Sequence, residues 1–465
     1  MPDEPAIVED DLFVSYRKLA EDLVRCVRAI EAMGIGPDRL AGIEHPRRYT
    51  HLLLLLACEV IGAATTSLAV GQNDELARYC DVILSGGDQA ADAPPRTHVL
   101  PPDWIAGLSA SPVHVDELTL FDRAVAPGRL ARIVRTSGTT GTPKAIMLSR
   151  SAQLRRAMRS IDSVARDIPP NPKFLCLYSL TVAAVYWRVL GVLLHGGTVL
   201  FTIGRHAGAL IAAGAVDYAM FAVGDIERFL ENAAPPPGGH SLQVRVFGAA
   251  LAPRLRQLIL ERLNAPVANP YATNETSTIT MDSAGGALCA GVEARIVDDA
   301  GRDKPLGATG LVRVRTDAMA QGYFNDAAMT TACFIDGWFQ TNDIGMIPEP
   351  GRLIVLSRAD DMLNIGGVKV PPAPIEDQLK RIDTVSDAIV MSVAGPNDIG
   401  ILLAAIEIGG DEVPADMAQQ IGAIISRHVG RFEIMPLRSF PRTESGKTIR
   451  PEIEASFRRR QATRP

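Results

Sequence analysis

Cysteine and histidine are scarce in this chain, and neither occurs in the spacing of a common metal or redox motif. The 465 residues include six Cys, and no two of them form a CxxC pair. So few cysteines exclude a disulfide scaffold, and the missing CxxC pair argues against a zinc or thioredoxin-like site. The eight His contain no HExxH pair, which argues against that metalloprotease motif. We therefore expect the cysteines to be buried free thiols.

An excess of charge of one sign is also lacking. Lys plus Arg number 47 and Asp plus Glu 53, so the net charge is −6. This balance provides no electrostatic reason to expect nucleic acid or an anionic membrane as a partner. In the segment 52–70 the apolar run 52–58 is interrupted by Glu59 and followed by the polar residues Thr65-Thr66-Ser67, so the segment is too short and polar to span a bilayer. The N-terminus is acidic and unlike a signal peptide, and we expect a cytoplasmic protein.

Local patterning predicts a mixed α/β chain. Apolar residues between 15 and 33 recur at spacings of three and four, which predicts a helix closed by Gly34. The segment 52–70 predicts a core helix followed by a strand. Beyond it, short apolar segments alternate with helical ones, the pattern of an α/β fold. Near the C-terminus we expect strands at 353–356, 388–393 and 401–408 and a helix at 417–429, which form a small α+β part that begins near residue 360.

The stretch 136–144 is the most informative in the chain. It reads Thr-Ser-Gly-Thr-Thr-Gly-Thr-Pro-Lys and follows a predicted strand end at Ile133-Val134. Its two Gly permit close backbone approach and positive φ, and successive backbone N–H groups can surround an anion. The stretch does not match the P-loop pattern GxxxxGK followed by Ser or Thr. We interpret it as a triphosphate-binding loop, the alternative being an ordinary flexible Ser/Gly loop.

Four further stretches follow in order along the chain. Residues 271–275 (Tyr-Ala-Thr-Asn-Glu) combine an aromatic face, suited to a base, with a carboxylate of the kind that Mg²⁺ prefers. The others are 336–343 (Asp-Gly-Trp-Phe-Gln-Thr-Asn-Asp), 357–370 (Ser-Arg-Ala-Asp-Asp-Met-Leu-Asn-Ile-Gly-Gly-Val-Lys-Val) and 441–450 (Pro-Arg-Thr-Glu-Ser-Gly-Lys-Thr-Ile-Arg). Taken singly, each stretch has a plain structural alternative. In the same order, these are a surface loop, a turn or cap residue at Asp343, a polar linker and a solvated lysine.

Together these five stretches resemble motifs of the adenylate-forming superfamily. That superfamily includes acyl-CoA synthetases, aryl-CoA ligases, peptide-synthetase adenylation domains and luciferases. The resemblance covers nearly the whole chain and departs from the family pattern at Ala145, Ala272, Asn274, Ser357 and Pro374. It implies an α/β protein with a large multi-sheet N-terminal domain that binds ATP and acid, over 1–357. A small, mobile α+β C-terminal domain over 358–465 would turn about a hinge at Asp360.

The resemblance also implies roles for single residues. Tyr271 would stack on adenine, Asn269 would meet the adenine edge, Glu275 would hold Mg²⁺, and Asp343 and Arg358 would contact ribose. Residues implied to take part in catalysis are Thr139, Glu275 and Lys447. Residues implied to bind nucleotide or coenzyme A are Thr136, Ser137, Gly138, Thr140, Gly141, Lys144, Asn269, Tyr271, Asn274, Asp343, Arg358, Gly366 and Gly367.

The reaction that the resemblance implies has two steps and uses ATP, Mg²⁺ and coenzyme A. A carboxylate attacks the α-phosphate of ATP and releases pyrophosphate, and a thiol then displaces AMP from the acyl-adenylate. Lys447 would serve the first step. Rotation about Asp360 would exchange its loop for the one at Gly366-Gly367, which lines the pantetheine tunnel.

The acid is expected to be fatty or aromatic. Amino-acid-activating members carry an Asp near 178–188, and this chain has none there. The segment is instead apolar and aromatic, which suits such an acid, although Tyr186 and Trp187 are equally well explained as core residues. The residues predicted to line the acid pocket are Tyr178, Tyr186, Phe221, Gly248 and Ala249.

Two alternatives stay open at this point. The chain could transfer its acyl group to a separate carrier protein in place of coenzyme A. It could also be a non-catalytic nucleotide-binding relative, which the motif substitutions favour. Retention of Lys144, Glu275, Asp343, Arg358 and Lys447 argues against that second alternative.

Overall fold

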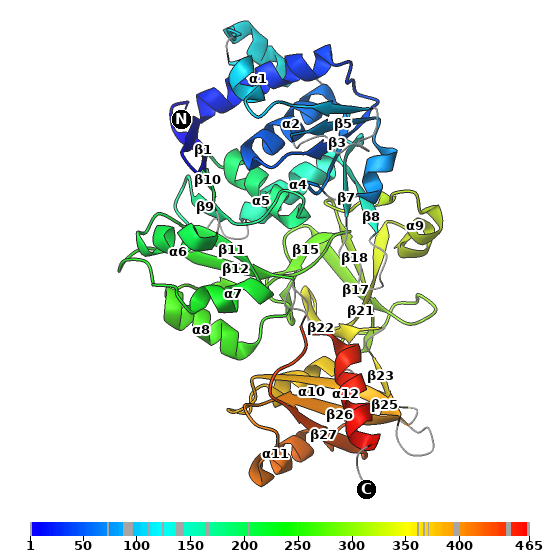
Figure 1. The fold of residues 1–465 in the computed structure, drawn as a ribbon. Coiled ribbons are helices and arrows are strands. Elements are labelled where there is room, and N and C mark those ends of the chain that lie inside the picture. Colours follow the sequence, from blue (N-terminus) through cyan, green and yellow to red (C-terminus); the bar gives the residue numbers. More distant parts are fainter. Residues whose placement is uncertain are drawn as a thin grey trace.

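A computed structural model of the chain shows two parts of unequal size (Figure 1). It describes residues 2–71, 74–86, 96–109, 111–122, 125–135, 144–162, 167–202, 204–248, 250–359, 362–365, 368–370, 372–394, 400–442 and 448–462. Within the described residues, the larger part carries three large sheets and one two-stranded hairpin, and the smaller part follows them at the C-terminal end. The expected α/β fold is therefore confirmed.

The first sheet has seven strands in the order β13-β12-β11-β9-β10-β1-β2. Its strands are β1 (Pro5–Glu9), β2 (Leu12–Ser15), β9 (Lys173–Cys176), β10 (Thr198–Phe201), β11 (Tyr218–Ala222), β12 (Gln243–Phe247) and β13 (Val267–Ala268). All neighbours are parallel except β1 and β2. The carboxyl ends of the parallel strands therefore share one edge, which is where α/β sheets bind ligands.

The second sheet also has seven strands, in the order β19-β8-β7-β4-β3-β5-β6. Its strands are β3 (Leu40–Glu44), β4 (Ala64–Ser67), β5 (Val82–Ser85), β6 (Thr97–Val99), β7 (Leu130–Arg135), β8 (Ala145–Ser149) and β19 (Gly322–Tyr323). The predicted strand end at Ile133-Val134 is confirmed within β7. Since β8 begins directly after Lys144, the second sheet fixes the position of Lys144 at the end of the stretch 136–144.

Helices pack between and over these two sheets. α1 (Tyr16–Ala32) confirms the helix expected at 15–33, and its first turn is capped by the Ser15 side chain, which accepts from the Lys18 N–H. α2 (Arg48–Ile61), followed by β4, confirms a core helix leading into a strand. The remaining helices of the larger part are α3 (Trp104–Leu108), α4 (Arg150–Asp162), α5 (Ala183–Leu194), α6 (Gly204–Ala212), α7 (Val223–Leu230), α8 (Pro253–Leu263) and α9 (Ala327–Cys333), with 3₁₀ turns at Glu75–Tyr79 and Val115–Asp122.

The third sheet is antiparallel, in the order β16-β22-β21-β18-β17, with β20 paired to β21. Its strands are β16 (Gly285–Ala287), β17 (Val292–Val297), β18 (Thr309–Thr316), β20 (Phe334–Ile335), β21 (Trp338–Glu349) and β22 (Arg352–Arg358). The hairpin of β14 (Tyr271–Thr273) and β15 (Ser277–Thr280) connects it to the first sheet. The strand expected at 353–356 is confirmed within β22.

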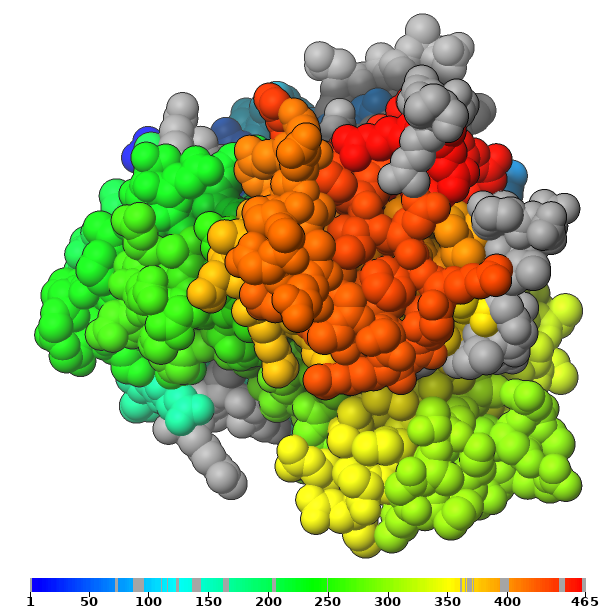
Figure 2. Space-filling view, turned by 90° about the horizontal axis from the view of Figure 1, so that it is seen from below, coloured from blue at the N-terminus to red at the C-terminus, as the bar shows by residue number. Residues whose placement is uncertain are grey.

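The C-terminal part has its own apolar cores. Its strands are β23 (Leu363–Ile365), β24 (Val368–Val370), β25 (Asp387–Ala394), β26 (Gly400–Glu407) and β27 (Phe432–Leu437), and its helices are α10 (Pro372–Leu379), α11 (Ala415–Ile425) and α12 (Arg450–Ala462). Viewed from below, it lies over the junction between the green and yellow segments of the larger part (Figure 2). The helix expected at 417–429 is shorter in the structure and ends at Ile425. The prediction ran too far because Val429 is buried and continues the apolar pattern, although it lies beyond a turn and is not helical.

The six cysteines differ in burial. Cys26, Cys58, Cys80 and Cys176 are buried free thiols as expected, while Cys289 and Cys333 are only half-buried. Within the described residues, no helix has the length and apolar character needed to cross a bilayer.

Candidate active site

Tyr178 joins the carboxyl ends of three strands at the ligand-binding edge of the first sheet. It follows β9, and its hydroxyl accepts from the Ala222 N–H (2.6 Å) at the end of β11 and donates to Asp225 Oδ2 (3.0 Å) at the start of α7. Its ring meets the edge of Phe247, the last residue of β12, at 5.2 Å between centroids. Burial raises the pKa of the Tyr178 hydroxyl. Tyr178 therefore lies at the edge where the strands end, and its role in an acid pocket stays a prediction.

Asn269 organises the same edge through the backbone. Its side chain is 1% exposed, Nδ2 donates to the Val246 carbonyl (3.0 Å), and Oδ1 accepts from the Leu251 N–H (2.9 Å). The loop it holds contains Gly248 at φ +99°, a backbone conformation that favours glycine. The structure thus gives the Asn269 amide a loop-holding role, and its implied contact with the adenine edge stays a prediction.

Tyr271, Asp343 and Arg358 converge from three separate strands. The Tyr271 hydroxyl donates to Asp343 Oδ2 (2.5 Å), and Asp343 on β21 is the cross-strand partner of Arg358 on β22. The Thr341 hydroxyl accepts from the Asp343 N–H (3.1 Å). Burial and the Asp343 charge raise the pKa of Tyr271 well above its usual value, so its hydroxyl stays a donor. The residues implied to contact adenine and ribose are therefore neighbours.

Lys144 and Glu275 converge through a residue that the sequence did not single out. Tyr323 on β19 donates its hydroxyl to Glu275 Oε1 (2.7 Å), and Lys144 Nζ lies over the Tyr323 ring at 5.6 Å from its centroid. Glu275 is half-buried at the turn of the β14–β15 hairpin. The implied metal ligand and the implied phosphate-binding lysine thus meet around one aromatic ring.

Arg156 on α4 supports the hairpin turn from below. Its guanidinium is 1% exposed and donates to the carbonyls of Asn274 (2.7 Å), Glu275 (2.9 Å) and Ala318 (2.8 Å). It also stacks on the Trp187 ring at 4.5 Å. Burial lowers the pKa of Arg156 to about 9. No local pattern marks Arg156 or Tyr323 for these roles, because their partners lie far away in the sequence.

Two of the predicted pocket residues belong to the core. Tyr186 is fully buried, donates its hydroxyl to Glu59 Oε1 (2.6 Å) and carries the Arg132 guanidinium over its ring. Phe221 is also buried, on the face of β11 that packs against α7, where its ring contacts Phe229 at 4.8 Å. For Tyr186 the structure favours the core alternative. For Phe221 the alternation of side chains along β11 places it in the core and corrects the pocket assignment.

Several predicted residues lie outside the described part of the chain. They are Thr136, Ser137, Gly138, Thr139, Thr140, Gly141, Ala249, Asp360, Gly366, Gly367 and Lys447. Their roles stay predictions.

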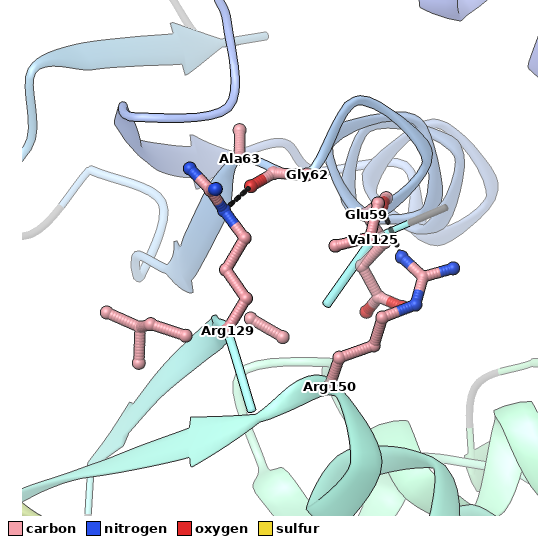
Figure 3. Close-up of a pocket in the computed structure, with 8 residues that line it drawn as sticks. Glu59, Gly62, Ala63, Val125, Arg129 and Arg150 are labelled. Atoms are coloured by element: carbon pink, nitrogen blue, oxygen red, sulfur yellow. Dashed lines mark hydrogen bonds between the residues drawn. The ribbon is translucent and has the colours of Figure 1, made fainter. Parts of the chain in front are cut away.

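A separate small pocket lies at the opposite end of β8 from Lys144 (Figure 3). Arg129 Nε donates to the Gly62 carbonyl (2.9 Å), and Arg150 Nη1 donates to the Glu59 carbonyl (2.7 Å). Both guanidinium groups therefore bind the backbone near the end of α2. These contacts give the pocket a packing role between α2 and the second sheet.

The fold and the converging residues define a nucleotide-dependent, acid-activating enzyme, and comparison with known proteins agrees. The family described as AMP-binding enzyme matches residues 1–324, and the chain belongs to that family. This confirms the resemblance found in the sequence.

The chain is also similar to individual members of this class. It is 26% identical over 509 residues to a methyl-dioxo-octahydro-indenyl propanoyl:CoA ligase of Mycobacterium tuberculosis, with 97% of this chain and 96% of that protein covered. It is 24% identical over 484 residues to tyrocidine synthase 3 of Brevibacillus parabrevis, covering 97% of this chain and 7% of that protein. The crystal structure of apo MatB from Rhodopseudomonas palustris shares its fold, with a TM-score of 0.80, 20% identity and coverage of 98% and 96%.

Proposed function

We propose that this protein activates a carboxylic acid with ATP to an acyl-adenylate and then transfers the acyl group to coenzyme A, releasing AMP and pyrophosphate. One observation carries the proposal. The β14–β15 hairpin sets Tyr271 against Asp343 and sets Glu275 against Tyr323, whose ring lies beneath Lys144. A single hairpin thus presents one group for the nucleoside and another for the phosphates of the same nucleotide.

The charges of these groups suit the first step. The acid carboxylate attacks the α-phosphorus, a P–O bond to pyrophosphate breaks, and the acyl-adenylate remains. Two anions must approach each other, so cations placed in advance stabilise the charge that develops at phosphorus. Lys144 provides one such cation, and we assign Lys447 as the second. The thiol of coenzyme A then attacks the acyl carbon and AMP leaves.

The residues around Glu275 fit a magnesium ion that is bound together with ATP. Within the described residues, no group of three or more His, Cys, Asp or Glu side chains could hold a metal. Mg²⁺ usually binds through one or two carboxylates plus substrate phosphates, and the half-buried Glu275 supplies such a carboxylate. When bound there, the ion would offset the negative charge of the phosphates.

The second step rests on the division of the chain into two domains. We propose domain boundaries of 1–357 and 358–465. The hinge would lie at Asp360, two residues after β22 ends at Arg358. The separate apolar cores of the C-terminal part support a unit that can turn as a body. Turning would remove Lys447 and bring in Gly366-Gly367 beside the thiol.

A fatty or aromatic acid is the proposed substrate class. The edge of the first sheet presents the rings of Tyr178 and Phe247 in edge contact, and the segment 178–188 has no Asp for a substrate ammonium. Similarity to a ligase of a ring-bearing propanoyl acid supports the same class. Transfer to a carrier protein is the second candidate, which the similarity to tyrocidine synthase 3 favours.

Pyrophosphate release over a panel of fatty, aromatic and amino acids tests the proposal. We expect release with a fatty or aromatic acid, and thioester formation when coenzyme A is added. Adenylation without thioester formation on coenzyme A would favour the carrier-protein candidate. No release with any acid would overturn the enzymatic proposal in favour of a nucleotide-binding relative.

A further inference from the structure

We propose that Tyr323 is a positioning residue that orients the Glu275 carboxylate for the metal. The inference rests on the proposed function, in which Glu275 holds Mg²⁺. Tyr323 is well placed for this, because β19 pairs antiparallel with β8, the strand that begins directly after Lys144. The pairing brings Lys144 over the Tyr323 ring, while the Tyr323 hydroxyl reaches Glu275 at the hairpin turn.

The Tyr323 side chain is held on several sides. It is 5% exposed, its ring meets the edge of Phe334 at 5.8 Å, and its backbone N–H donates to the Thr330 hydroxyl (2.9 Å) on α9. The Tyr323 hydroxyl donates to Glu275 Oε1 from this buried position. The hydroxyl is thus a donor held in one place.

The backbone of Glu275 is fixed independently of its side chain. Its carbonyl accepts from Arg156 Nη2 (2.9 Å) and from the Ala320 N–H (2.7 Å). The remaining freedom of Glu275 lies in its side-chain torsions, and the hydrogen bond from Tyr323 to Oε1 restricts these. With Oε1 bound to Tyr323, the Glu275 carboxylate has one fixed orientation in which it would hold the metal.

Hydrogen bonds of this kind orient carboxylates that bind metals, and their loss typically weakens metal binding about 10- to 100-fold. Lys144 contacts the face of the Tyr323 ring, a contact that phenylalanine would keep. The substitution Tyr323→Phe therefore removes the donor to Glu275 while leaving the ring beneath Lys144. This separates metal positioning from lysine positioning.

The test measures binding of α,β-methylene ATP, a non-cleavable ATP analogue, to the full chain with saturating MgCl₂ and with EDTA. For Tyr323→Phe we expect the Kd in EDTA to stay at the wild-type value and the Kd in Mg²⁺ to rise about 10-fold or more. Tyr49→Phe is the matched control, because the buried Tyr49 hydroxyl also donates to a carboxylate, Asp22 Oδ2 (2.8 Å), between α1 and α2. The control should keep the wild-type response to Mg²⁺.

Equal weakening in Mg²⁺ and EDTA, or no change in either, would overturn the assignment. Glu275→Asp is a second variant, which retracts the carboxylate from Tyr323 and keeps its charge. Glu275→Asp should also weaken analogue binding in Mg²⁺ and not in EDTA. The double variant Tyr323→Phe with Glu275→Asp should bind no more weakly than either single variant. Additive losses would mean that Tyr323 does not act through Glu275 and would overturn the assignment. A wild-type protein that binds the analogue with the expected Mg²⁺ dependence but releases no pyrophosphate with any acid would refute the proposed function alone.

Discussion

Asp343 shows how one carboxylate can serve both the protein and a ligand. Its Oδ2 accepts from Tyr271 and its backbone N–H donates to Thr341, so its orientation is set before any ligand arrives. The pKa of Tyr271 is raised, which keeps that hydroxyl a donor across the physiological range. A contact between Asp343 and the ribose hydroxyls is the role that the family resemblance implies, and it stays a prediction.

Asp343→Ala should raise the KM for ATP. Hydrogen bonds to charged groups contribute about 1.5–3 kcal/mol, so the increase should be about tenfold or more. Steady-state kinetics at saturating acid will measure it. Asp298→Ala provides a control, because Asp298 also accepts hydrogen bonds but only from its own turn, at Arg302 and Ala300. A fall in kcat with an unchanged KM for ATP would contradict a ribose-binding role.

Lys447→Ala should abolish the first half-reaction and largely spare the second. Removing one charged group that stabilises a transition state costs about 10²- to 10³-fold in rate, and Lys447 is assigned to adenylation alone. Pyrophosphate release and thioester formation from supplied acyl-adenylate should be measured separately. Equal loss of both half-reactions would refute the assignment.

Helix α5 contains the aromatic residues Tyr186 and Trp187, which the sequence left open as pocket or core residues and which are structural. It lies in the core, and three consecutive residues pair with cations or rings on three different elements: Tyr186 with Arg132 of β7 (4.2 Å), Trp187 with Arg156 of α4 (4.5 Å), and Arg188 with Tyr218 of β11 (5.3 Å). A helix contacted on all sides is buried. Its aromatic residues therefore join the sheets.

Helix α2 carries a histidine whose titration should affect stability. His51 is buried, and its Nε2 lies 2.8 Å from the Ser67 hydroxyl on β4. Burial, with the nearby Arg132 charge, lowers the pKa of His51 to about 3. Since the unfolded chain binds the proton near pH 6.5, the folded protein is favoured above that pH and loses stability as the pH falls from 6.5 toward 3.

His51→Gln should remove this part of the pH dependence. Between pH 7.5 and 5.0 the wild type should lose about 2 kcal/mol more unfolding free energy than the variant, with the slope approaching about 1.4 kcal/mol per pH unit below pH 6. Urea-unfolding midpoints at pH 7.5, 6.0 and 5.0 will show the difference. His98→Gln, at an exposed position on β6, should keep the wild-type profile. Parallel curves for wild type and His51→Gln would contradict the buried, neutral state.

At the scale of the whole molecule, the central feature is the junction after β22. This strand ends at Arg358, the cross-strand partner of Asp343 in the proposed nucleotide site, and the proposed hinge follows two residues later. Nucleotide contact and domain rotation would therefore share one short segment. Motion of the C-terminal domain would thus be coupled to occupancy of the ribose site.

Asp360→Pro should slow thioester formation more than adenylation. Proline locks φ near −65°, which restricts rotation about the hinge without touching the nucleotide groups. Single-turnover assays of each half-reaction will measure the two rates. Asp360→Ala removes the same side chain but keeps the backbone free, so it should stay close to wild type. Equal slowing of both steps by proline would refute a hinge at this position.

Local sequence patterns predicted the elements well and their partners poorly. α1 and the strands at 353–356, 388–393 and 401–408 are confirmed, since apolar periodicity reports directly which face is buried. The helix at 417–429 was drawn too long, because Val429 is buried without being helical. Phe221 was misplaced, because the choice of face along β11 depends on which helix covers it.

The order of five motifs in the sequence by itself determined the family and indicated the identity of the nucleotide-site residues. Only the tertiary structure decided how they meet: Tyr323 reaches Glu275 across 48 residues, and Arg156 reaches the same residue across 119. The physical reason is that backbone propensity and hydrophobic period act over a few residues. Strand pairing and buried hydrogen bonds join distant segments, and they form only when the sheets pack together.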